Sequence, residues 1–204
     1  MERRNFLIGM GSTAAGASAL VGSGAFSRIE SQRQVSIEVA NDTNAYLGLD
    51  ACHDDSGNKL PNGSYTETDG RGHLTIEMDS DNKTAEGGQG VNSDSHSWFN
   101  DVFQMCNQGK DDVGVSIDTS DANIGTVPED YDDSGEDRVQ FYVGDGSGDV
   151  GGELDRIDDG STHDLALGSC TCVGILVITK GLSDGDTVLD GEVVITADVD
   201  DYSG

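Results

Sequence analysis

Four cysteines are the residues of this 204-residue chain whose type and number point most directly to covalent chemistry: Cys52, Cys106, Cys170 and Cys172. An even number of cysteines favours disulfides in a chain that is exported, which the leader described below indicates. A bridge between Cys170 and Cys172 would be strained, because one residue separates them. We therefore expect Cys52 and Cys106 each to pair with one of these two, in either order. The rival interpretation, a four-cysteine metal site, lacks the paired C-x₂-C spacing of a zinc ribbon.

Acidic loops raise the question of calcium. Residues 145–149 alternate aspartate with glycine and serine, but an EF-hand loop would need glycine where Val150 stands and glutamate where Arg156 stands. That motif is absent, and a hydrated acidic surface is the default expectation, with no cofactor. A looser calcium site is left as an alternative at two acidic pairs, Asp132 with Asp133 and Asp184 with Asp186.

The histidines and serines show no catalytic spacing. His53, His73, His96 and His163 occur without H-x-H or H-E-x-x-H spacing, and no serine stands in a G-x-S-x-G motif. No glycine-rich stretch has a P-loop or dinucleotide-binding pattern either. We expect a protein that is not an enzyme, with no catalytic and no metal-binding residues.

Three asparagines stand in N-x-[ST] tripeptides, the acceptor motif for N-linked glycans in exported proteins: Asn41, Asn62 and Asn82. All three occur early in the mature chain and mostly in turn-like contexts. Export makes occupancy of at least one of them an expectation.

The first residues carry an export signal. Arg3 and Arg4 form a twin-arginine signature, and a glycine- and alanine-rich apolar stretch and a run of small residues follow. The apolar stretch is shorter than the ~20 residues that a membrane-spanning helix needs. We therefore expect residues 1–26 to be a twin-arginine signal peptide, leaving a secreted or cell-surface protein with no stable membrane span after cleavage.

The charge of the chain limits its partners. A formal net charge of −28, from 39 acidic and 11 basic residues, opposes binding to nucleic acid or to an anionic membrane surface. At molar salt the Debye length falls to about 3 Å, so self-repulsion is screened while the carboxylates hold water. We interpret the chain as a folded protein adapted to high salt, with residues 27–204 forming one domain.

Short alternating strands fill the mature chain. Apolar and polar residues alternate at 33–40, 139–143 and 192–199, whereas 173–179 is a nearly unbroken apolar run that should be covered on both faces. With 29 glycines, 2 prolines and almost no helix signal, this pattern predicts an all-β fold, a jelly-roll-like antiparallel β-sandwich. Further short strands are expected at 46–51, 74–78 and 165–167.

Residues 97–118 hold the only tryptophan and two of the five phenylalanines. The strand-like runs 102–106 and 112–118, joined by a polar loop, predict a β-hairpin. A short helix at 97–101 is an alternative, because Trp98 and Phe99 each have an apolar residue four positions later.

The run WFNDVF at 98–103, followed by NQG at 107–109 and a Val-x-Val strand, resembles the pattern of the TasA/camelysin-like secreted proteins, in particular their haloarchaeal relatives, a family of surface proteins. The leader ending at 22–26 and the C-terminal residues 181–186 and 189–191 add to the resemblance. The resemblance implies a jelly-roll sandwich and assembly into extracellular fibres.

Assembly of this kind needs a segment that reaches another molecule. Residues 33–40 follow the leader directly and place Val35, Ile37 and Val39 on one face, which needs a hydrophobic partner. The segment fits an edge of its own sandwich or the same edge of a neighbour. We expect a non-enzymatic structural protein, a homo-oligomer or filament subunit of an extracellular or biofilm matrix assembled by strand donation. The alternatives are a monomeric envelope-associated surface or binding domain and, third, a secreted hydrolase.

Overall fold

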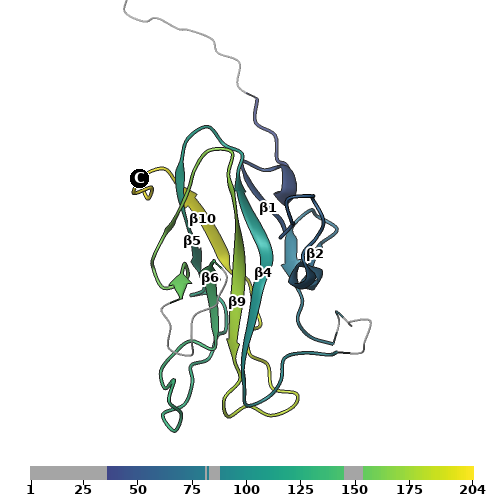
Figure 1. Ribbon diagram of the computed structural model, residues 1–204, viewed down its shortest axis with the longest axis vertical. Coiled ribbons are helices and arrows are strands. Elements are labelled where there is room, and N and C mark those ends of the chain that lie inside the picture. Colours follow the sequence, from purple (N-terminus) through teal and green to yellow (C-terminus); the bar gives the residue numbers. More distant parts are fainter. Residues whose placement is uncertain (1–35, 81, 83–87, 145–153) are drawn as a thin grey trace, which may run out of the picture. The chain divides into compact units, whose positions relative to one another are not determined.

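The computed structural model describes residues 36–80, 82, 88–144 and 154–204 (Figure 1). The chain divides into a segment, Met1–Glu38, and a compact unit, Val39–Gly204. The predicted leader, Val35 and the acidic stretch 145–149 lie outside the described residues. No helix in the described part of the chain is long and apolar enough to cross a membrane.

The described residues form antiparallel sheets and no α-helix. The larger sheet has the order β1 (Leu47–Ala51), β4 (His96–Asn107), β9 (Cys170–Ile178), β6 (Val139–Val143) and β7 (Asp155–Arg156). The smaller sheet has the order β10 (Val194–Asp198), β5 (Val113–Asp118) and β8 (His163–Leu165). A hairpin pairs β2 (Thr66–Thr68) with β3 (Leu74–Ile76), and two short 3₁₀ helices are η1 (Asp42–Asn44) and η2 (Pro61–Tyr65). The predicted all-β antiparallel sandwich is confirmed, and its jelly-roll connectivity stays a prediction.

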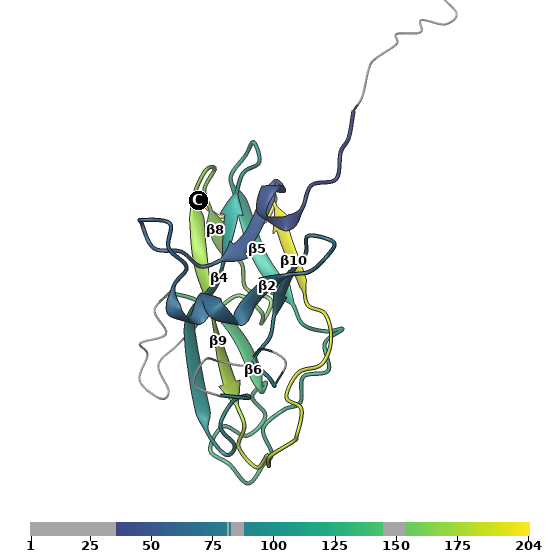
Figure 2. The same ribbon diagram turned by 90° about the vertical axis from the view of Figure 1, so that its right-hand side faces the viewer.

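One hydrophobic core lies between the two sheets. Alternate residues of β4, β6 and β9 meet those of β5 and β8 there, and the rings of Phe103 and Phe141 contact each other edge-on with centroids 6.5 Å apart. Tyr65 of η2 packs against this core, as do the apolar residues of β3, so the short hairpin closes one side of the sandwich (Figure 2). The core consists of Val102, Phe103, Met105, Val115, Ile117, Val139, Phe141, Ile157, Leu165, Val173, Ile175 and Val177.

Strand β9 is buried on both faces, as its unbroken apolar run predicts. Val173, Ile175 and Val177 face the inter-sheet core. On the other face, Leu176 and Ile178 form a second cluster with the buried Tyr142 of β6 and with Val127 from the loop that covers them. A central strand covered on two sides needs apolar residues at every position, which is why the alternation disappears here.

The predicted β-hairpin between 102–106 and 112–118 is wrong. The first run belongs to β4 in the larger sheet and the second to β5 in the smaller one, so the connection crosses from one sheet to the other. Asn107 stabilises the connection between the two sheets, because its Nδ2 donates hydrogen bonds to the carbonyls of Asp111 (2.8 Å) and Leu165 (3.0 Å). The pattern of alternation is the same for two strands that pair and for two that face each other across a core, so it did not distinguish them. The short helix at 97–101 is also wrong, because these residues lie in β4.

The strand predicted at 33–40 is not formed in its described part. Residues 36–40 lie outside any strand, with Ile37 88% and Val39 100% exposed. Alternation shows which face of a segment is apolar, but a strand forms only where another strand is available to pair with it.

Replacing Gly174 tests the packing of the outer face of the larger sheet. A Cβ at Gly174 would overlap the ring of Tyr142, whereas one at Gly70 would meet nothing within 4 Å. We expect Gly174→Ala to lower the free energy of unfolding by about 1–3 kcal/mol through overpacking. Gly70→Ala, the matched control, should be near neutral in the same denaturant titration in molar salt. Equal stabilities of the two variants would contradict this packing.

Candidate functional site

The four cysteines form two disulfides, Cys52–Cys172 and Cys106–Cys170, with Cα–Cα distances of 5.7 and 4.0 Å. This settles the order that the sequence left open. Cys106 lies directly opposite Cys170 in the pairing of β4 with β9, and Cys52 directly follows β1. Both bridges lie on the face of the larger sheet that points away from the inter-sheet core, because Cys170 and Cys172 alternate with the inward-facing Val173. The two disulfides fit an extracellular protein.

A β-bulge interrupts β4 beside one of these bridges. The register with β9 shifts between Phe99 and Phe103, and Asp101 has a left-handed backbone with φ of 56°. Asn62 of η2 donates its Nδ2 to the carbonyl of Asn100 (2.7 Å), which satisfies a backbone group that the bulge removes from the ladder. This bulge was not predicted from the sequence, although an Asn-Asp pair inside an aromatic strand is a signal for one.

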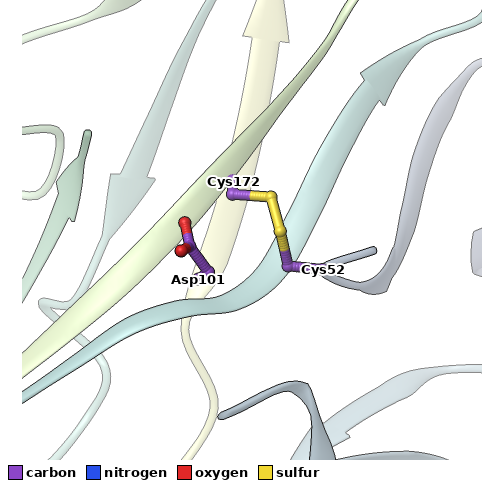
Figure 3. Close-up of side chains that lie close together, drawn as sticks. All are labelled: Cys52, Asp101 and Cys172. Atoms are coloured by element: carbon purple, nitrogen blue, oxygen red, sulfur yellow. A yellow bond between two sulfur atoms is a disulfide. The ribbon is translucent and has the colours of Figure 1, made fainter. Parts of the chain in front are cut away.

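The side chain of Asp101 lies close to the Cys52–Cys172 disulfide (Figure 3). One ligand atom from each of Cys52, Asp101 and Cys172 lies within 4.8 Å of the others, and this is the one such group of three in the described part of the chain. Metals bind the thiolate, and a disulfide sulfur carries no such charge. In this oxidised form the trio therefore offers a metal ion a single carboxylate. Neither acidic pair proposed for calcium belongs to a three-ligand group among the described residues.

The histidines lie apart on different elements. His96 contacts Asp133 with Nε2 2.6 Å from Oδ2, and its ring packs on Trp98 with centroids 5.7 Å apart. This pair connects the start of β4 to an acidic turn. Within the described residues no serine or threonine hydroxyl bonds to this imidazole. The remaining three are His53 in a bridge with Lys59, His73 near Asp69, and His163 in β8.

The three predicted glycosylation sites have different settings. Asn41 is exposed and caps η1, where its side chain accepts a hydrogen bond from the backbone N–H of Asn44. Asn62 lies half-buried in η2, and Asn82 lies half-buried after β3. Only Asn41 is freely presented at the surface.

The edge of the smaller sheet at β10 leaves apolar side chains uncovered. Ile195 and Ala197 pair with Ile117 and Val115, so they share the face that points to the core. Ile195 is nevertheless only half-buried and Ala197 is exposed. Val194 and Val199 are 50% and 54% exposed, and β10 has no strand partner on its other side among the described strands.

Aspartates at turns and strand ends accept backbone N–H bonds. The side-chain carboxylate of Asp164 accepts a hydrogen bond from the backbone N–H of Ser203 (2.9 Å), which is the main cause of a pKa below the ordinary value of 3.8. The same bond attaches the C-terminus to β8. Backbone N–H donors likewise lower the pKa of four others: Asp54 (from Asn58), Asp69 (from His73), Asp118 (from Ser120) and Asp159 (from Ser161).

The fold and these surfaces define a strongly acidic, disulfide-bonded, all-β domain with a sheet edge at β10 that no described strand covers. The sequence matches no protein-family model and no curated protein. The chain's own geometry is therefore the main basis for a functional proposal.

Removing either disulfide should destabilise the protein to a similar degree. The bridges span 120 and 64 residues, but each shortens the loop that the other closes, so chain entropy gives roughly 4 kcal/mol for each. Cys52→Ser/Cys172→Ser and Cys106→Ser/Cys170→Ser should both show this loss in denaturant titrations in molar salt. Alkylation of the unfolded, unreduced wild-type chain would reveal free thiols and would contradict the presence of two disulfides.

Acid should destabilise the protein when salt screens its charge. A carboxyl whose pKa is lower in the folded chain stabilises the fold above about pH 3.8, its ordinary pKa, and loses that contribution as pH falls through the folded value. We therefore expect the free energy of unfolding in molar salt to fall between pH 5 and pH 2. Asp164→Asn should weaken this dependence, since an amide does not titrate there. A stability that is flat or rises over this range would contradict the assignment.

Proposed function

We propose that the protein is an exported, non-enzymatic structural subunit that assembles into an extracellular filament or cell-surface matrix by strand donation. The observation that carries this proposal is a pair of matching surfaces: an unpaired segment with exposed apolar residues, Ile37 and Val39, and an uncovered strand edge at β10. The segment at 36–40 lacks a strand to pair with, and β10 offers an edge at which a strand can pair.

The donor is the segment at 36–40. Ile37 and Val39 are two residues apart, so they lie on one face when the segment is extended. Both are almost fully exposed in the single chain, and burying them would contribute roughly 1.5–3 kcal/mol each. By sequence Val35 belongs to the same face.

The acceptor is the free edge of β10. A strand added beside it would gain backbone hydrogen bonds to β10 and would place its apolar face over Ile195 and Ala197. The smaller sheet has three strands against five in the larger one, so a fourth strand would extend its cover of the core. Glu38 would then point outward to solvent.

Charge makes this assembly dependent on salt. The full chain carries a formal net charge of −28, so two copies repel each other in dilute buffer, and at molar salt the Debye length of about 3 Å removes most of that repulsion. Assembly is thus restricted to concentrated brine. The resemblance to TasA/camelysin-like proteins supports the same function, as do the twin-arginine signature and the disulfides.

The alternative function is that of a monomeric envelope-associated surface domain. Acidic residues at and beside β10 favour it, because charges on an edge strand commonly prevent pairing with a second copy. They are Glu192, Asp198, Asp200 and Asp201.

Sedimentation velocity in molar salt separates the two functions. The wild-type mature chain should form large species as its concentration rises, and Ile37→Asp should weaken association at least tenfold, because burial of Ile37 is worth about 1.5–3 kcal/mol. Ser36→Asp adds the same charge on the opposite face and is the matched control, which should still assemble. A wild-type chain that stays monomeric, or an Ile37→Asp variant that assembles normally, would overturn strand donation.

A further inference from the structure

We infer that Asn41 is the attachment site of an N-linked glycan, and that the folded chain withholds the other two acceptor tripeptides from modification. This inference concerns a modification site and does not depend on assembly. It rests on which side-chain amide nitrogens the fold already uses.

The chemistry of transfer sets the requirement. The asparagine Nδ2 bonds to the anomeric carbon of a lipid-phosphate-linked oligosaccharide while the bond from that carbon to the phosphate oxygen breaks. The phosphate leaves with the electron pair, and the amide nitrogen gives up one proton to a base of the oligosaccharyltransferase. An acceptor must therefore present Nδ2 to the enzyme, together with the hydroxyl of the third residue of the tripeptide.

The side chains of the Asn62 tripeptide are already engaged in hydrogen bonds within the fold. Asn62 Nδ2 donates to the carbonyl of Asn100 at the β4 bulge (2.7 Å), and the Ser64 hydroxyl donates to the carbonyl of Pro61 (2.6 Å). Gly63 between them is buried against the carbonyl of Cys52. The Nδ2 of Asn62 and the hydroxyl of Ser64 are thus both engaged in hydrogen bonds, and both bonds must break before transfer.

Asn82 is engaged in a similar way. Its Nδ2 donates to the carbonyls of Ser64 (3.1 Å) and Glu77 (3.0 Å), which uses both amide hydrogens. Its side chain is half-buried. Transfer to Asn82 requires both of these bonds to break first.

Asn41 presents the opposite arrangement. Its side-chain oxygen accepts from the backbone N–H (3.1 Å) and the Nδ2 (2.7 Å) of Asn44, which fixes the amide with its nitrogen turned away from the helix η1. Among the described residues nothing accepts a hydrogen bond from this nitrogen. Asn41 and Thr43 are both exposed, so the nitrogen and the hydroxyl are available together.

Selection among the three sites follows from folding. In an unfolded chain the three asparagines are equally accessible, whereas in the described part of the folded chain only Asn41 is exposed with an amide nitrogen that donates no hydrogen bond. Since two hydrogen bonds must break at either of the other sites, occupancy of Asn41 should exceed that of Asn62 or Asn82 by about tenfold or more. Occupancy therefore reports whether the chain was folded when it met the transferase.

Glycopeptide mass spectrometry tests the inference on the full chain, secreted with its own leader by a haloarchaeal host that N-glycosylates. We expect a glycan at Asn41, its loss in Thr43→Ala, and its retention in Ser64→Ala. A glycan at Asn62 or Asn82 in the folded protein, or an unmodified Asn41, would overturn the inference.

A second measurement tests the cause of the selection. Purified oligosaccharyltransferase with its lipid-linked donor should modify Asn41 alone in the folded chain, but all three asparagines in the reduced and denatured chain. Selection of Asn41 alone in both forms would show that local sequence, rather than the hydrogen bonds of Asn62 and Asn82, decides the site, and would overturn the structural explanation.

Discussion

The antiparallel pairing of β4 with β9 is the constraint on which the rest of the structure depends. The two strands lie side by side from His96 opposite Ile178 to Cys106 opposite Cys170, and β1 and β6 attach to their outer edges (Figure 1). Their inward residues make much of the core between the sheets. Their outer face carries both disulfides and the bulge at Asp101, so cross-links, core and bulge all fix the same register.

High negative charge acts against this arrangement, and local pairing offsets it where the chain is buried. Arg156 of β7 binds three carboxylates, Asp158 (2.9 Å), Asp137 (3.1 Å) and Glu136 (3.5 Å). The side chain of Asp158 is only 1% exposed and also accepts a hydrogen bond from the backbone N–H of Phe141. It therefore connects β7, at the edge of the larger sheet, to β6. Most other acids lie on the surface, where salt and water rather than partners neutralise them. Covalent bridges suit such a chain, since they do not weaken when salt is diluted.

Much of the sandwich follows from periodicity in the sequence. The runs at 139–143 and 173–179 form β6 and most of β9. They are recognisable because burial of one or both faces of a strand requires apolar residues at the buried positions. The disulfide partners were limited to two arrangements by the spacing of Cys170 and Cys172, and three-dimensional contact chose between them.

What the sequence did not reveal depends on contacts between distant residues. Pairing across a loop and packing across a core give the same alternation, so the crossing at Asn107 was mistaken for a hairpin. The uncovered edge at β10 has an ordinary strand pattern and is distinguished only by what lies beside it. Likewise, nothing local separates Asn41 from Asn62: the difference is the carbonyl of Asn100, 38 residues away in the chain.

Amide hydrogen exchange in molar salt tests strand donation most directly, because it reports on both partner segments at once. Exchange is compared between dilute and concentrated samples of the mature chain. The account predicts that the amides of residues 37–40 and of β10 become protected together as concentration rises, while exchange elsewhere changes little. Amides at 37–40 that exchange freely at every concentration, or that are already protected in the dilute monomer, would contradict it.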